Sequence, residues 1–165
     1  MIGDRWGVTE DEVARRYPCD DLVPAPVLQA WRGVTVRTTP DRVWPWIAQL
    51  RLAPYSYDWV DNLGRRSPEQ LVDFSEPAVG QHFTTAATRP IGRVLSVAPE
   101  EQLTGRIAGT VMSYVLMPAA GDSTRLLMKI VAANGRWAAP LISVGDLVMA
   151  RRQLLNFKRL AERPR

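Results

Sequence analysis

Between residues 80 and 132 the chain alternates short segments rich in β-forming residues with breaks at glycine and proline, among them Pro90, Pro99 and Gly109. The segments recur about every ten residues, which is the spacing of an antiparallel meander. A run of alternating apolar and polar residues precedes them. We therefore expect strands over residues 29–38, 81–86, 92–97, 102–107, 111–117 and 123–132.

Helical signals flank these strands. An apolar stripe at helical spacing predicts a long helix over residues 141–162. Thr9 and Glu12 form a capping box, which predicts a short helix over residues 10–16. After the first strand, cap and stop residues predict two or three more short helices, over residues 40–50, 57–63 and 67–70.

The order of these elements predicts an α+β fold. With 165 residues the chain has the length of one domain. A sheet must bury at least one of its faces against another element, and only the last helix is long enough to cross such a face. We expect an antiparallel curved sheet wrapped around that helix, with space between them. Residues 1–27 are expected to form an N-terminal helix and arm packed on the domain, which comprises residues 28–165.

Composition narrows the functional classes. The net charge is +4, but no nucleic-acid-binding module accompanies the basic residues. Those after residue 150 would lie on one face of the last helix, either simply solvated or facing an anionic membrane surface or partner. No apolar run reaches the roughly 18 residues of a membrane span. The lone Cys19 fits a reducing compartment, and we expect a cytoplasmic protein.

Residues 40–64, the aromatic segment, combine several tryptophans and tyrosines with the carboxylates of Asp58 and Asp61. This mixture is costly to leave in water yet too polar for a simple core. It is typical of the mouth of a cavity for a small, largely apolar ligand. The aromatic and acidic residues that define it are Trp44, Trp46, Tyr55, Tyr57, Asp58, Trp59 and Asp61.

The chain resembles the polyketide cyclase/dehydrase branch of the START-like (SRPBCC) superfamily over residues 7–162. The residues that carry the resemblance are Val43-Trp44-Pro45-Trp46-Ile47, Gln49, Tyr55-Ser-Tyr-Asp58, Asn62, Thr124-Arg-Leu126 and Val148-Met-Ala-Arg-Arg152.

The resemblance implies a helix-grip fold: a curved antiparallel sheet of six to seven strands around a long C-terminal helix, with a deep apolar cavity between them. Its members carry lipids, bind hormones or cyclise polyketides, so the fold does not specify one activity. Asp61 departs from the Glu usual in this subgroup, which shortens the reach of that carboxylate by one methylene.

Few side chains can carry chemistry. With one His and one Cys there is no metal-ligand cluster, and no nucleotide-binding motif is present, so no metal and no cofactor are expected. His82 is expected to face outward. Tyr57, Asp58 and Asp61 could act as acid–base residues if the carboxylates are partly buried among tryptophans. Alternatively, the two carboxylates pair with arginines at the end of the helix.

Alternation along the strands and helical spacing select the residues expected to face the cavity. Arg106 could anchor an anionic group of the ligand there, whereas Arg125 and Lys129 are expected on the opposite face, with Arg125 solvated. The expected ligand-binding residues are Trp46, Tyr55, Phe83, Arg106, Tyr114, Leu116, Leu126, Met128, Leu147 and Val148, with Met149 as a further candidate on the long helix.

Two functions from different classes remain. The first is a carrier or cyclase-like protein, monomeric or homodimeric, that encloses a hydrophobic or aromatic molecule similar to a polyketide or a lipid. If it is an enzyme, the cavity would fold a reactive chain and exclude water. The second is a regulatory or stress-related binding module without turnover, which would act through protein or membrane-surface contacts on its basic helix.

Overall fold

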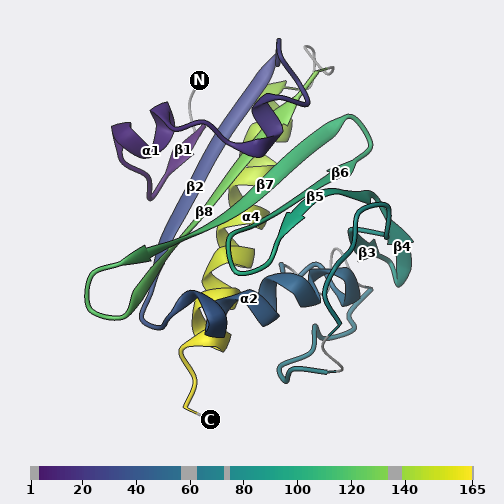
Figure 1. Cartoon of the computed structure of the whole chain (residues 1–165). Coiled ribbons are helices and arrows are strands. Elements are labelled where there is room, and N and C mark those ends of the chain that lie inside the picture. The colour runs from purple at the N-terminus through teal and green to yellow at the C-terminus, as the bar shows by residue number, and fades with distance from the viewer. Residues whose placement is uncertain (1–3, 57–62, 73–74, 134–138, 165) are drawn as a thin grey trace.

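The computed structural model describes residues 4–56, 63–72, 75–133 and 139–164, with the backbone alone described for residues 139–147. One sheet separates two layers of the chain (Figure 1). The long C-terminal helix α4 (Ala139–Ala161) crosses one face of this sheet, and the N-terminal segment covers the other. The predicted α+β architecture is thus confirmed.

The main sheet has six strands in the order β1-β2-β8-β7-β6-β5. Its last four strands in sequence pair antiparallel, each with the next, as the meander predicted. The strands are β1 (Arg5–Trp6), β2 (Leu28–Val36), β5 (Arg93–Ala98), β6 (Gln102–Ile107), β7 (Thr110–Ala119) and β8 (Ser123–Ala132).

Two details of the predicted sheet are wrong. The short strand β1 pairs parallel to β2, so the sheet is mixed, not purely antiparallel. The segment predicted as a strand over residues 81–86 contributes only β3 (Thr84–Ala86), which pairs with β4 (Arg89–Ile91) in a separate hairpin. This hairpin lies beside the sheet, next to the short helices (Figure 1).

The short helices agree in part with the prediction. Thr9 and Glu12 form the expected capping box of α1 (Glu10–Ala14). After strand β2 come α2 (Pro40–Ala48), with Thr39 at its N-cap, and the 3-10 helix η2 (Gln49–Leu52). Residues 67–70 form no helix, and the predicted helix over residues 57–63 falls largely outside the described residues.

The main core lies between the sheet and α4. Because side chains alternate along β8, Leu126, Met128 and Ile130 all point to this inner face. Phe157 and Leu154 of α4 pack against them, and α2 closes one end.

No helix among the described residues combines the length and hydropathy needed to cross a bilayer.

A second apolar cluster covers the outer face of the sheet and includes Tyr17, Trp31 and Leu127. Lys129 is buried there: its Nζ lies 2.5 Å from a carboxylate oxygen of Asp20 and 5.0 Å from the centroid of the Trp31 ring. Burial raises the pKa of Tyr17 to about 12. The N-terminal segment therefore forms a third layer of the structure.

Arg125 belongs to the same outer layer. Its guanidinium donates hydrogen bonds to the carboxylate of Glu12, with Nε and Nη2 each 2.8 Å from an oxygen, and these bonds lower the pKa of Glu12. The expectation that Arg125 is merely solvated is therefore wrong. The helix that holds Glu12 lies far from Arg125 in sequence, and only the folded N-terminal segment brings the two together.

Candidate functional site

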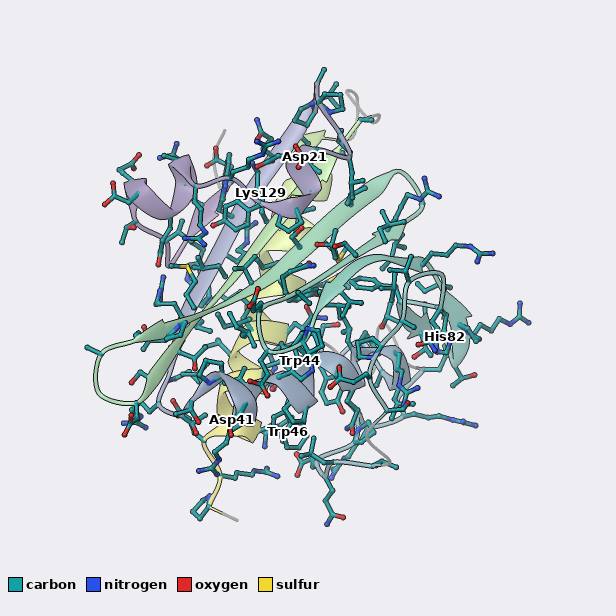
Figure 2. All side chains as sticks on the ribbon, viewed as in Figure 1. Asp21, Asp41, Trp44, Trp46, His82 and Lys129 are labelled. Carbon is teal, nitrogen blue, oxygen red and sulfur yellow. The ribbon has the colours of Figure 1, made fainter. Side chains whose placement is uncertain are left out.

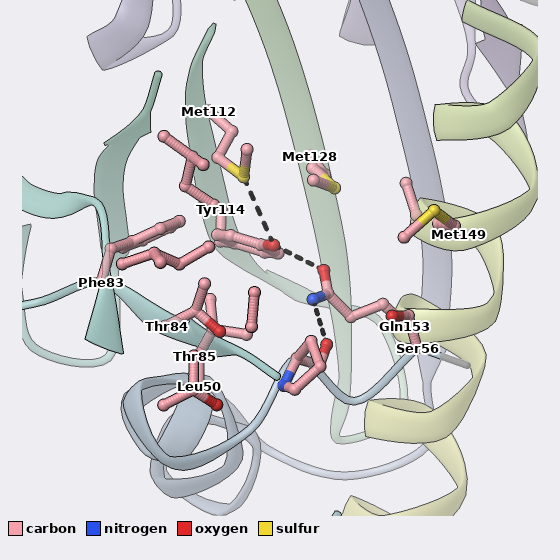
Figure 3. Close-up of a pocket in the computed structure, with 15 residues that line it drawn as sticks. Leu50, Ser56, Phe83, Thr84, Thr85, Met112, Tyr114, Met128, Met149 and Gln153 are labelled. Carbon is pink, nitrogen blue, oxygen red and sulfur yellow. Dashed lines mark hydrogen bonds between the residues drawn. The ribbon is translucent and has the colours of Figure 1, made fainter. Parts of the chain in front are cut away.

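A pocket of about 200 Å³ lies where the inner face of the sheet and α4 diverge. The β3–β4 hairpin and η2 form its remaining walls (Figure 3). Most of its lining is apolar, and none of the lining residues that the structure describes carries a formal charge. The residues that line it are Leu50, Pro54, Ser56, Phe83, Thr84, Thr85, Ala86, Ile91, Ile107, Met112, Tyr114, Met128, Met149, Ala150 and Gln153.

Strand register explains which sheet residues reach the pocket. Tyr114 of β7 is the direct cross-strand partner of Met128 on β8, so the two side chains lie side by side on the inner face. Met112 stands two residues before Tyr114 and therefore shares that face. The three side chains form the floor of the pocket in Figure 3. Flexible thioethers beside a phenol ring suit ligands of variable shape.

Phe83 forms the wall between the sheet and the hairpin. Its ring lies directly on the backbone of Gly105 in β6, where an added Cβ would come within 2.1 Å of Phe83 Cδ2. On another side the ring packs against Tyr114 with a centroid distance of 6.3 Å. The absence of a side chain at residue 105 therefore determines where the aromatic wall stands.

Hydrogen bonds join three parts of the chain across the pocket. The Tyr114 hydroxyl donates to Gln153 Oε1 of α4 at 2.5 Å, and Gln153 Nε2 donates to the carbonyl oxygen of Pro54 at 2.5 Å (Figure 3). Thr85 Oγ1 donates to the carbonyl oxygen of Leu52 at 3.3 Å, which connects the hairpin to η2. These bonds hold the sheet, the helix and the loop around one space.

The structure distributes the expected ligand-binding residues over several places. Phe83, Tyr114, Met128 and Met149 line the pocket. Leu116 and Leu126 are buried in the core but do not reach it. Val148 is 46% exposed, because it faces away from the sheet one residue before Met149. Leu147 lies outside the residues whose side chains are described, and so do Tyr57, Asp58 and Asp61.

Arg106 is exposed, which corrects the expectation that it reaches the cavity. Along β6 its neighbours Gly105 and Ile107 face the inner side, so alternation directs the arginine outward. His82 is exposed as expected, and its Nε2 lies 3.2 Å from the carbonyl oxygen of Arg51.

Three aromatic side chains of this segment, those of Trp44, Trp46 and Tyr55, are packed into the structure and do not line the pocket. The Trp44 indole donates to the carboxylate of Glu76, with Nε1 3.1 Å from Oε2. Trp46 is buried in the core beside α4. Tyr55 is buried against Phe157, with ring centroids 5.2 Å apart, and its hydroxyl accepts from Gln49 Nε2. Figure 2 shows Trp44 and Trp46 on α2, below the sheet.

Sequence reasoning missed Gln153, Thr84 and Met112. A signal for Gln153 was present, because it lies four residues after Met149 and thus on the same helical face. Met112 could have been inferred from Tyr114 by strand alternation. Thr84 carried no such signal, because its hairpin was expected to be part of the main sheet.

A second cleft, of about 370 Å³, lies on the other side of residues 55 and 56. Its lining is basic and includes Arg66, Arg152 and Arg159. Glu69 lies 3.1 Å from Arg159 and has a lowered pKa, because its carboxylate accepts hydrogen bonds from Arg159 and Arg163.

Among the described residues, no group of three or more His, Cys, Asp and Glu side chains could hold a metal ion.

Comparison with known proteins yields similarity of structure only. No family model matches the chain, and no curated protein matches its sequence. Protein MLL2253 from Mesorhizobium loti superposes with a TM-score of 0.58 at 16% identity, covering 84% of this chain and 99% of the other.

The names of two further solved structures refer to a polyketide cyclase-like protein and to a biosynthetic locus. The Polyketide_cyc-like protein Cgl2372 from Corynebacterium glutamicum superposes with a TM-score of 0.52 at 13% identity, covering 85% of this chain and 94% of the other. DynU16, described as a putative protein in the dynemicin biosynthetic locus, has a TM-score of 0.52 at 16% identity, covering 81% of this chain and 47% of the other. The chain therefore shares the fold of these proteins, among them one named Polyketide_cyc-like.

Proposed function

We propose that this protein binds a small, largely apolar molecule in the pocket between the sheet and α4. The observation that carries the proposal is the lining itself: methionine, aromatic and aliphatic side chains from seven elements converge on one space of about 200 Å³. A somewhat smaller apolar cavity, of roughly 150 Å³, is enough to hold benzene. A molecule of one or two rings therefore fits this pocket.

The expected affinity follows from the area that such a ligand buries. A two-ring aromatic molecule buries about as much surface as a tryptophan side chain, roughly 250 Å². At about 25 cal/mol per Å² the transfer contributes roughly 6 kcal/mol, which corresponds to a Kd of some tens of micromolar. Tighter binding requires specific polar contacts in addition.

Titration with the neutral, two-ring fluorescent probe 1-naphthylamine tests the proposal. We expect saturable binding with one probe per chain. Met149→Trp should abolish it, because the indole fills the pocket, whereas Val148→Trp should not, because this neighbouring residue on the same helix faces solvent. Absence of saturable binding, or equal binding by the two variants, would refute the proposal.

A cyclase-like activity is the finer form of this proposal. Ser56 lines the pocket, and Tyr57 and Asp58 are the next two residues in the sequence. A carboxylate there would take a proton from the carbon between two carbonyls of a polyketide-like chain, and the walls would hold that chain folded and exclude water. Asp58→Asn should then remove cyclisation of a linear poly-β-ketothioester and leave probe binding intact. Loss of both together would indicate that Asp58 acts on the structure.

One observation favours the second candidate, a binding module without turnover. The solvent-facing side of α4 places Val148 and Leu155 beside Arg151, Arg152 and Arg159, all of them exposed. Such a face suits an anionic bilayer surface. Sedimentation with phosphatidylserine vesicles should then show binding that disappears as salt rises, because screening weakens surface charge. Binding that is unaffected by salt, or no binding at all, argues against this candidate.

A further inference from the structure

The polar side chains of the pocket differ in whether the protein supplies them with a hydrogen-bond partner. Tyr114 and Gln153 bond to each other, and Thr85 bonds to the carbonyl oxygen of Leu52. Ser56 also has a partner. Thr84 Oγ1 alone among these groups is buried without a hydrogen-bond partner, on a side chain that is only 5% exposed.

A buried hydroxyl without a partner is unusual, because its desolvation is not compensated. Thr84 cannot easily turn toward solvent, since its strand β3 is paired with β4 and its side chain lies inside the pocket wall. The hydroxyl can either donate or accept one further hydrogen bond. The partner that the protein does not supply can therefore come from a molecule in the pocket.

The absence of formal charge around Thr84 restricts the chemistry of such a molecule. None of the described residues that line the pocket is acidic or basic. An ionised ligand would lose its hydration without gaining a counter-charge, which strongly disfavours binding. Carbonyl and hydroxyl oxygens are neutral groups that can pair with a threonine hydroxyl.

We propose that Thr84 is a ligand-binding residue, and that the ligand is an uncharged molecule whose carbonyl or hydroxyl oxygen pairs with Thr84 Oγ1. This inference rests on the proposed function of the pocket and adds the polarity and orientation of the ligand. Figure 3 places Thr84 on the hairpin side, across the pocket from Met128 and Met149. The polar end of the ligand faces the hairpin, and its apolar body lies against the methionines.

Calorimetric titration with the matched pair 1-indanone and indane tests this inference. The two molecules share a ring system and differ in one carbonyl group. Thr84→Val preserves the shape of the side chain and removes its hydroxyl, so binding of 1-indanone should weaken about tenfold while binding of indane changes by less than about twofold. Thr84→Ser retains the hydroxyl and should keep most of the affinity for 1-indanone.

Thr85→Val is the matched control on the same strand, because the hydroxyl of Thr85 is already bonded within the protein. This substitution should change the affinities for 1-indanone and indane equally or not at all. If Thr84→Val leaves 1-indanone binding unchanged, or weakens both probes alike, the role of Thr84 is refuted while the pocket still binds apolar molecules. If neither probe binds to the unaltered protein, both the role of Thr84 and the proposed function are refuted.

Discussion

Gly105→Ala is the substitution that tests most directly how the pocket is built. The added Cβ would lie 2.1 Å from Cδ2 and 2.4 Å from Cε2 of Phe83. Ordinary contacts between carbon atoms are about 3.5–4.0 Å, so the ring must move by more than about 1 Å. Tyr114 packs against the ring on one side, and the pocket is the free space next to it.

The size of the effect follows from this geometry. Forcing an additional carbon into a packed core destabilises a protein by about 1–3 kcal/mol. We expect the free energy of unfolding in urea to fall by that amount. Because the displaced ring takes up part of a pocket of about 200 Å³, the affinity for 1-naphthylamine should fall as well.

The control is Gly109→Ala, since a Cβ at residue 109 has no atom within 4 Å. This variant should unfold at the same urea concentration as the unaltered protein and bind the probe equally. Combining Gly105→Ala with Phe83→Leu should restore much of the lost stability, because the smaller side chain leaves room for the methyl group. A Gly105→Ala protein with unchanged stability and unchanged probe affinity would refute the reasoning.

Three further outcomes follow from the contacts described. Gln153→Leu removes the amide oxygen to which the buried Tyr114 hydroxyl donates and the amide that donates to the carbonyl oxygen of Pro54, and should lower the free energy of unfolding by about 1–3 kcal/mol, measured in urea. The ion pair with Arg125 lowers the pKa of Glu12 from its ordinary 4.5, so the pair stabilises the fold above pH 4.5 and this contribution is lost as the pH falls through the lowered pKa. Urea titrations should accordingly show a steeper loss of stability below pH 4.5 than in Glu12→Gln, and equal slopes would contradict the assignment. Burial raises the pKa of the Cys19 thiol, so Ellman's reagent should react with it much more slowly in native than in unfolded protein. Equally fast labelling in both states would show that this thiol is accessible.

Local signals predicted the secondary structure well where they were strong. Strands β6 (Gln102–Ile107) and β8 (Ser123–Ala132) begin and end where the pattern placed them, because glycine and turn residues bound each of them. The capping box at Thr9 correctly marked the start of α1. The capping pattern at Ser67 failed, since it was not followed by an apolar helical stripe that could be buried.

The pocket was predictable only in outline. Alternation predicted that Phe83, Tyr114 and Met128 point inward, as they do. It does not indicate which inward-facing side chains reach the pocket and which are packed in the core. Leu116 and Leu126 share the same face and pack solidly elsewhere. The tryptophans of α2 looked like cavity residues from composition alone, yet α2 turns them into the core and toward Glu76.

The antiparallel meander from β5 to β8, the long terminal helix and the two-sided pattern of these strands were determined by the sequence alone, because they depend on neighbours a few residues apart. Tertiary structure alone decided that the N-terminal segment covers the outer face and pairs Glu12 with Arg125, 113 residues away. It also placed Thr84 of the hairpin across the pocket from α4 and the sheet, and so left one hydroxyl unpaired inside a pocket whose described lining carries no charge. Such contacts depend on where separate elements come to rest in space, and local spacing in the sequence carries no record of that.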